Sequence, residues 1–275
     1  MTRPLTLLSS EAASSAFFRR LRGPARCSRC SALAPYVLES GRYRCRACRH
    51  TFALFGGTWL ARTRLPSREV AHLLYLFVLG VPSYRARHYT GGSLKTMQRV
   101  YTRFREAIYQ ATLQELEPLS GVLELDETLF GPRNRPGKRG WGATGKRVVF
   151  GIYQRNGHVL CFPVPSRKRA TLFPLIEEYT KPGSLYITDE YIGYASLAIR
   201  SNHVVVQKKD GLPQGRDHLN GIEGFWSYAK HWLYQYRGVP QHHFELYLKE
   251  IEWRFNHRND DLIGSLGHVL VSTVT

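Results

Sequence analysis

Three acidic side chains carry the clearest chemistry that this 275-residue sequence offers. Asp126 follows the apolar run LEL and Asp189 follows LYIT, so each aspartate is expected to close a β-strand. Two carboxylates at one sheet edge repel each other unless a cation compensates them. Hard oxygen ligands favour Mg²⁺ or Mn²⁺ over zinc, and a pair of such ions can serve in-line phosphoryl transfer. Taken singly, each aspartate is better explained as a turn residue than as part of a site.

The third carboxylate of such a site is expected from Glu223, in the stretch HLNGIEGFWSYAK. Helical spacing gives this stretch an apolar stripe, with Glu223 at its edge and able to point along the sheet toward the aspartates. Lys230 lies nearly two turns further on the same side, where it could meet a phosphate. Asn220 followed by Glu223 also resembles a capping box, which explains the glutamate without catalysis. The two roles are compatible. The expected stripe comprises Ile222, Phe225, Trp226, Ala229, Leu233 and Tyr236.

Alternating strands and helices must position these acids. Strands are expected over 121–131, 146–154, 158–166, 184–190 and 202–209, and helices over 171–180, 191–200, from 220 onward, and over 242–258. This order predicts an α/β domain with a mixed five-stranded sheet and helices on both faces, which is the ribonuclease-H-like plan. The first and fourth strands are then neighbours, so Asp126 and Asp189 can meet. Strand alternation turns Glu127 and Glu190 away from the side that the aspartates face.

Four cysteines indicate a second kind of metal site. The pairs CSRC and CRAC, separated by 14 residues, predict a tetrahedral zinc site in a small zinc ribbon formed by Cys27, Cys30, Cys45 and Cys48. Reactive thiol pairs or disulfides are the alternatives. Because four thiolates leave no open position, the zinc is expected to be structural, and His50 is expected to be a bystander.

Two helices are expected between the ribbon and the sheet. The first begins near Ser67, with Glu69 in its first turn, and the second is capped by Ser93. Lys95, Arg99, Arg103 and Arg105 are expected to decorate the second helix outside its apolar side. Two helices joined by a glycine-containing turn are similar to a helix-turn-helix that binds DNA. A plain helical linker with a solvated basic face is the alternative.

The motifs LELDET, ITDEYIGYASL and HLNGIEGFWSYAK together resemble the DDE transposases of ISXO-type bacterial insertion sequences, which are related to Merlin transposons. The spacings D-x62-D, D-x33-E and E-x6-K match this family. The resemblance covers nearly the whole chain, and the HxNxIExFW block is its most specific part.

The resemblance implies a mechanism and partners. Asp126, Asp189 and Glu223 would hold two Mg²⁺ (or Mn²⁺) ions. One ion would activate water to cut DNA at a transposon end, and the exposed 3′-hydroxyl would then attack target DNA. Lys230 would hold a phosphate near the scissile bond, and His218 and Asn220 would lie nearby as a possible second shell. Pairing two DNA ends implies a homodimer or a higher oligomer on double-stranded DNA.

The charge distribution agrees with a polyanionic partner. Of the net charge of +18, a balance of +10 lies in residues 1–66, where 12 arginines face two acids. Such a field favours nucleic acid. Candidate DNA contacts lie in the ribbon, the second helix and the loop 133–147: Arg42, Arg44, Arg46, Arg49, Lys95, Arg99, Arg103, Arg133, Arg135, Lys138, Arg139 and Lys146. Trp141, in the same loop, could stack on a base.

These features predict three domains: a zinc ribbon over 1–62, a helix-turn-helix-like segment over 63–118 and a catalytic domain over 119–275. The sequence contains no apolar run of the roughly 20 residues that a membrane span needs. The CxxC pairs suit a reducing compartment, so a cytoplasmic, nucleoid-associated protein is expected. A metal-dependent nuclease or resolvase, and a DNA-binding regulator that does not cut, are the alternative functions.

Overall fold

The computed structural model describes residues 8–131, 145–194, 197, 202–206, 218–236 and 238–273. The chain forms two compact units, one of Met1–Ala111 together with His257–Thr275, the other of Thr112–Asn256. Among the described residues, no helix is both long enough and apolar enough to cross a membrane.

The first unit combines helices with a small three-stranded sheet. Its helices are α2 (Glu11–Arg22), α3 (Ser67–Val78), α4 (Ser83–Ala86), α10 (Leu262–Val271) and most of α5 (Leu94–Gln114). The antiparallel sheet has the order β1 (Tyr36–Val37), β2 (Tyr43–Arg44) and β3 (Thr51–Phe52). Ser93 accepts a hydrogen bond from the amide of Thr96 at 3.2 Å, so it caps α5 as expected. Arg105 is only 3% exposed and lies over the rings of Phe77 and Tyr101. The expectation that Arg105 decorates the surface is therefore wrong.

Helix α3 receives its N-terminal cap from another helix. It begins at Ser67, but the capping position is Pro66, which has no side-chain acceptor. Instead the two carboxylate oxygens of Glu11, on α2, accept hydrogen bonds from the amides of Ser67 and Arg68, each at 2.8 Å. A carboxylate at this end also suits the helix dipole.

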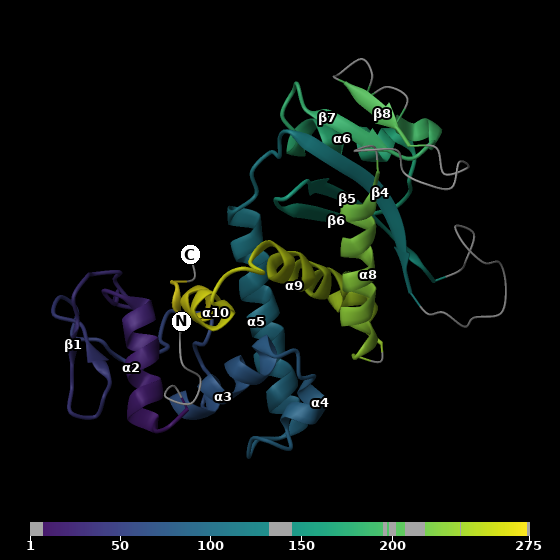
Figure 1. Cartoon of the computed structure of the whole chain (residues 1–275). Coiled ribbons are helices and arrows are strands. Elements are labelled where there is room, and N and C mark those ends of the chain that lie inside the picture. Colours follow the sequence, from purple (N-terminus) through teal and green to yellow (C-terminus); the bar gives the residue numbers. More distant parts are fainter. Residues whose placement is uncertain are drawn as a thin grey trace. The chain divides into compact units, whose positions relative to one another are not determined.

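The second unit contains the expected five-stranded sheet, in the order β6-β5-β4-β7-β8 (Figure 1). The strands are β4 (Val122–Phe130), β5 (Arg147–Gln154), β6 (Val159–Val164), β7 (Leu185–Thr188) and β8 (His203–Val205). The pairs β4–β5 and β5–β6 are antiparallel, whereas β4–β7 and β7–β8 are parallel. Three antiparallel strands followed by parallel additions confirm the ribonuclease-H-like plan and the adjacency of the first and fourth strands.

Helices cover both faces of this sheet, as expected. Side chains of α8 (Asn220–Tyr234) and α9 (Phe244–Asn256) pack with one face of the strands around Ile222, Trp226 and Leu248. Helix α6 (Arg169–Tyr179) packs on the other face, together with Tyr194 of the short 3₁₀ helix η2 (Ile192–Tyr194). A second 3₁₀ turn, η4 (Gln241–His243), precedes α9. The site described below lies between β4, the end of β7 and α8.

Candidate active site and metal centre

The four cysteines of the ribbon gather into one cluster. Their Sγ atoms all lie within 4.8 Å of one another, with Cys27 and Cys48 at 3.6 Å and Cys30 and Cys45 also at 3.6 Å. These spacings suit four thiolates at about 2.3 Å from a tetrahedral Zn²⁺. The turns also orient the sulfurs, because the amides of Arg29 and Cys48 donate to the Sγ atoms of Cys27 and Cys45 respectively. The donor set therefore fits a structural zinc ion.

Asp126 lies on β4, and Asp189 directly follows β7, the parallel neighbour of β4. Strand β4 pairs with β7 through Val122 with Leu185 and Glu124 with Ile187, an offset of 63 residues (185 − 122). The offset from Asp126 to Asp189 is also 63 (189 − 126), so the two residues would lie opposite each other if the register continued two residues beyond its last pair, Glu124 with Ile187. Asp189 directly follows β7, as expected. Asp126 does not close its strand: β4 continues to Phe130 because Glu127 to Phe130 pair with β5.

Both aspartates act electrostatically on one buried carboxyl group, that of Glu127. The pKa of Glu127 is raised to about 7, mainly by burial; the Tyr194 hydroxyl and Arg167 oppose the rise, and the charges of Asp126 and Asp189 add to it. Tyr194 donates a short hydrogen bond to Glu127. Glu127 thus faces η2 on the α6 side of the sheet, away from the α8 side that Asp126 faces, as strand alternation predicts.

Helix α8 contacts one face of β4 at three regular steps. Glu124 accepts a hydrogen bond from the amide of Ile222 at 2.9 Å. Asp126 accepts one from the indole Nε1 of Trp226 at 3.1 Å, and Thr128 accepts one from Lys230 Nζ at 2.6 Å. Each step is two residues of strand and four of helix, which are lengths of about 6.6 Å and about 6.0 Å. Residue numbers rise together on both elements, so the helix and the strand run in the same direction. Because the step lengths nearly match, the contact repeats three times.

The same contacts indicate where Glu223 lies. Gly221 and Glu223 flank Ile222 on the helix, each about 100° away from it in opposite directions. A Cβ on Gly221 would lie 2.2 Å from the ring of Tyr153, so the Gly221 flank faces β5. Glu223 therefore lies on the flank that faces β7, and Lys230 is on the same flank. Both side chains are exposed.

The carboxylates are less tightly gathered than the cysteines. Within the described residues, the four cysteines are the group of three or more potential ligands whose atoms lie close enough for one ion. Carboxylate oxygens, as on Asp126 and Asp189, are donors that Mg²⁺ and Mn²⁺ prefer, and Glu223 extends from helix α8. The structure thus places Asp126 on β4 and Asp189 directly after the neighbouring β7, with the exposed Glu223 on the helix that packs on β4.

The start of α8 differs from the expected capping box. The capping position is Leu219, and no side chain of the helix itself caps it. Asn220 is the first helical residue and its side chain is exposed. Glu124 supplies the acceptor in its place. The expected capping box, with Asn220 at the capping position, is therefore not the arrangement at this helix start.

His218 lies next to this helix start. Its backbone carbonyl accepts a hydrogen bond from Arg155 at 2.7 Å, and its ring Nδ1 lies 3.9 Å from Glu124. Glu124 and Arg155 were not among the predicted site residues. One signal was available: Glu124 lies two residues before Asp126, so both must share a strand face.

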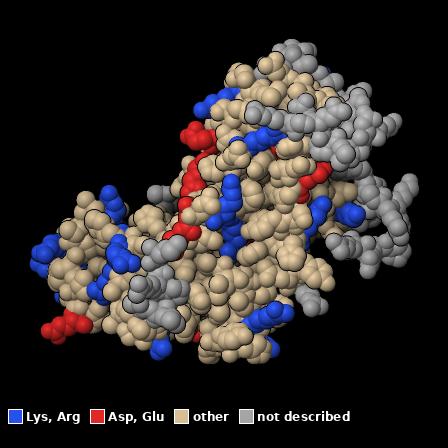
Figure 2. Space-filling view, in the orientation of Figure 1, with Lys and Arg blue, Asp and Glu red and all other residues tan. Residues whose placement is uncertain are grey.

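The predicted DNA contacts differ in their exposure. Figure 2 shows Lys and Arg side chains over the surface around β1 and α2. Arg103 is half-buried and donates to the carbonyl of Ala61 at 2.6 Å. The remaining loop candidates and Trp141 lie outside the described residues: Arg133, Arg135, Lys138 and Arg139. Of the described candidates, Arg42, Arg46, Arg49, Lys95 and Arg99 are exposed, whereas Arg44 and Lys146 are half-buried.

Comparisons with known proteins agree with this arrangement. The family described as the ISXO2-like transposase domain matches residues 118–256, about half of the chain and nearly all of the second unit. An "Uncharacterized transposase-like protein" from Haemophilus influenzae is 42% identical over 94 residues, which are 34% of this chain and 76% of that protein.

A solved structure, the "Crystal structure of the Mos1 Strand Transfer Complex", aligns with 73% of this chain and 97% of that one, at 12% identity. Its TM-score of 0.24 is too low to support a conclusion about the fold. The family match and the Haemophilus relative both lead to the same assignment. The chain therefore belongs to the family of ISXO2-like transposases.

Proposed function

We propose that this transposase cuts DNA at the ends of its element and joins the resulting 3′-hydroxyl to target DNA. Asp126, Asp189 and Glu223 would hold two Mg²⁺ or Mn²⁺ ions. The observation that carries the proposal is the pairing of β4 with β7, whose offset of 63 residues is also the offset from Asp126 to Asp189. When bound, the ions would activate the attacking oxygen and stabilise the leaving oxygen of the phosphodiester.

The protein's own groups would orient these carboxylates. The indole of Trp226 donates to one oxygen of Asp126, and the amide of Tyr191 donates to Asp189 Oδ1 at 3.0 Å. Each bond restricts the rotation of its carboxylate. Such preorganisation matters because catalysis falls steeply when reacting groups are misplaced by about 1 Å.

Lys230 would contact the DNA backbone next to the scissile phosphate. Its exposed side chain is held at 2.6 Å from Thr128, two residues beyond Asp126 on the same strand face. An ammonium group there could exchange a neutral hydroxyl for a phosphate oxygen, which is a stronger, charge-assisted partner.

The first unit would recognise the terminal inverted repeats. The zinc ion would hold the ribbon rigid, so that the exposed arginines Arg42, Arg46 and Arg49 reach phosphates and base edges. Lys95 and Arg99 would add contacts from α5. A homodimer would bring two ends together, in the cytoplasm where the nucleoid lies.

The test uses the full chain, DNA that carries the element's end sequence, a second target DNA and either Mg²⁺ or Mn²⁺. Cleavage followed by joining is the expected result. Glu223→Gln should abolish cleavage and joining and retain DNA binding. The matched control is Glu245→Gln, at an exposed glutamate of α9, which should retain both reactions.

Other outcomes would replace the proposal. Cleavage without joining would indicate a metal-dependent nuclease or resolvase. Binding without cleavage in either metal would indicate a DNA-binding regulator. Normal joining by Glu223→Gln would show that this glutamate is not part of the site.

A further inference from the structure

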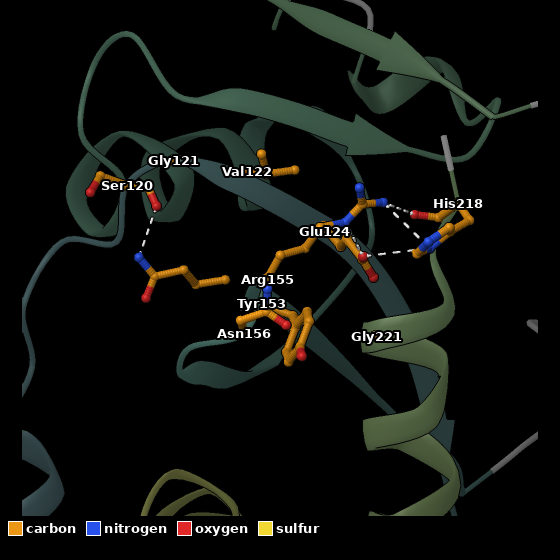
Figure 3. A pocket seen from close by; sticks show the side chains of 10 residues that line it. Ser120, Gly121, Val122, Glu124, Tyr153, Arg155, Asn156, His218 and Gly221 are labelled. Atoms are coloured by element: carbon orange, nitrogen blue, oxygen red, sulfur yellow. Dashed lines mark hydrogen bonds and ion pairs between the residues drawn. The ribbon is translucent and has the colours of Figure 1, made fainter. Parts of the chain in front are cut away.

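Glu124, Arg155 and His218 form a polar cluster where α8 begins (Figure 3). Glu124 has no exposed surface, and its Oε1 pairs with Arg155 Nε at 2.7 Å. Its Oε2 accepts the amide hydrogen of Ile222, the third residue of α8. Arg155 also donates to the carbonyl of His218, two residues before the helix. One carboxylate of β4 is thereby linked to the chain on both sides of the helix start.

The cluster satisfies groups that the helix cannot satisfy itself. The first amides of any helix lack intrahelical acceptors, and the side chain of Leu219, at the capping position, has no acceptor atom. A carboxylate at this end also interacts favourably with the helix dipole. A buried charge is costly unless it is paired, and Arg155 supplies the pair. The hydrogen bonds of Glu124 therefore stabilise the start of α8 specifically.

Glu124 shares its strand face with Asp126, and its helical partner Ile222 immediately precedes Glu223. The hydrogen bond between Glu124 and Ile222 therefore connects Asp126, two residues along β4, with Glu223, the next residue on α8. A slip of α8 by one residue would move Glu223 by about 1.5 Å and turn it by about 100°. Either change would take its carboxylate away from the aspartates.

We propose that Glu124, held by Arg155, is a positioning residue that sets where α8 begins on β4 and hence where Glu223 lies relative to Asp126 and Asp189. The proposal rests on the proposed function for the role of Glu223. Its structural half, that Glu124 holds the first turn of α8, is independent of that function.

Substitution at Glu124 should leave the protein folded. A cavity of about 710 Å³ borders the cluster, and Glu124, Arg155, His218 and Gly221 contribute to its lining. Water can enter a polar space of this size and satisfy the groups that a substitution leaves unpaired. Arg155 is itself 19% exposed, so its charge can be solvated if its partner becomes neutral.

Glu252 on α9 provides a matched control. It is also fully buried, its Oε2 also accepts a backbone amide hydrogen (Cys161, at 2.8 Å), and it also pairs with a cation (Lys249, at 2.8 Å). It joins α9 to β6 and lies outside the proposed site. Glu252→Gln and Glu124→Gln therefore each remove one buried carboxylate that is paired with a cation, and of the two only Glu124 has a hydrogen bond to α8.

The experiment compares wild type, Glu124→Gln and Glu252→Gln as full-length proteins. Mn²⁺ affinity is measured without DNA from the electron paramagnetic resonance signal of free Mn²⁺. Amide hydrogen exchange is followed at the first turn of α8, and thermal unfolding is recorded for each protein. Glu124→Gln should weaken Mn²⁺ binding by about tenfold, the lower end for residues that orient metal ligands. It should also speed exchange at Ile222 and Glu223. Glu252→Gln should lower thermal stability with wild-type Mn²⁺ affinity.

The possible results separate this proposal from the proposed function. Equal Mn²⁺ affinity and equal α8 exchange in the two variants would overturn the positioning role. Wild type that binds no Mn²⁺ at millimolar concentration would overturn the carboxylate metal site, while faster α8 exchange in Glu124→Gln would still support the structural half. If Glu124→Gln does not fold, Arg155→Lys replaces it, since lysine retains the charge but cannot bridge Glu124 and the His218 carbonyl. It should show a smaller loss of affinity, and wild-type affinity would overturn the proposal.

Discussion

The cysteine cluster and the proposed carboxylate site differ in how far apart in sequence their residues lie. All four cysteines lie within 22 residues of sequence (27 to 48), and two tight turns bring their sulfurs within 4.8 Å. The proposed carboxylate ligands span almost 100 residues (126 to 223) and depend on a parallel strand pair and on a helix that packs along β4. A local site needs its metal in order to fold, whereas a distributed site inherits its geometry from a folded sheet. This difference predicts which perturbations each site tolerates.

Zinc removal should have the largest effect, and it should be confined to the first unit. A structural zinc contributes about 10 kcal/mol or more to the folding of small domains, so Cys45→Ser or chelation should unfold the ribbon. End-specific DNA binding should be lost while the second unit keeps its fold. Circular dichroism, zinc content and hydrogen exchange of β4 and β7 measure these effects.

Cys161, buried in β6 of the second unit, supplies the control for that prediction. Cys161→Ala should retain the zinc. Unfolding of residues 112–256 after chelation would contradict the independence of the two sites.

Loss of one aspartate should have the next largest effect, on chemistry and not on folding. Asp189→Asn removes a charge that a metal ion would need, and a loss of about 4 kcal/mol in transition-state stabilisation corresponds to about a thousandfold in rate. Single-turnover cleavage in Mn²⁺ measures it. The neighbouring exposed Glu190→Gln should cleave at the wild-type rate. Equal losses in both variants would indicate a general effect of charge.

Gly151 tests whether the sheet itself determines the position of α8. A Cβ on this β5 residue would lie 2.6 Å from the Trp226 ring, which would have to move away from Asp126. Gly151→Ala should therefore cost about 1–3 kcal/mol of stability and should reduce cleavage. Urea unfolding and cleavage assays measure both effects.

A second glycine, on α8, is the matched control. Gly224 has open space around its Cβ position, so Gly224→Ala should stabilise the helix by about 0.5–1 kcal/mol. Destabilisation by both substitutions would show that α8 tolerates no change, whatever the space available.

The smallest expected effect concerns Glu11, which caps α3 in the first unit much as Glu124 serves α8 in the second. Glu11→Gln should cost about 1 kcal/mol of stability, a usual value for losing a cap, with no change in Mn²⁺ affinity. Thermal unfolding and a Mn²⁺ titration test it together. A change in Mn²⁺ affinity would mean that such caps act through general stability, which would weaken the special role assigned to Glu124.

Much of the second unit could be predicted because its signals are periodic and local. Apolar runs and their order were sufficient for the strand order and for the buried stripe of Ile222, Phe225, Trp226 and Ala229. The end of β4 was not predictable in this way. Charged Asp126 interrupts an apolar run, but pairing with β5 carries the strand through it.

Other features depend on contacts between distant residues, which a local pattern cannot reveal. Asn220 has the residue type of a cap, yet a buried glutamate about 100 residues earlier takes that role. Helix α2 was not predicted, because Phe17 and Phe18 are its only large buried side chains. Helix α10 was not predicted either, because it lies beyond the last segment in which a helix was expected. Arg105 was expected at the surface because of its charge, but it packs against aromatic rings of two helices.

The near match between the step lengths of β4 and α8 limits how these two segments can change during evolution. Substitutions at Leu125 or Glu127 leave the three contacts with α8 in phase. Inserting one residue between Glu124 and Asp126 would instead turn Asp126 to the opposite face of the sheet. An insertion between Ile222 and Trp226 would rotate the indole by about 100°. Relatives of this protein should therefore vary in composition along these two segments while keeping their lengths constant, and insertions should occur outside them.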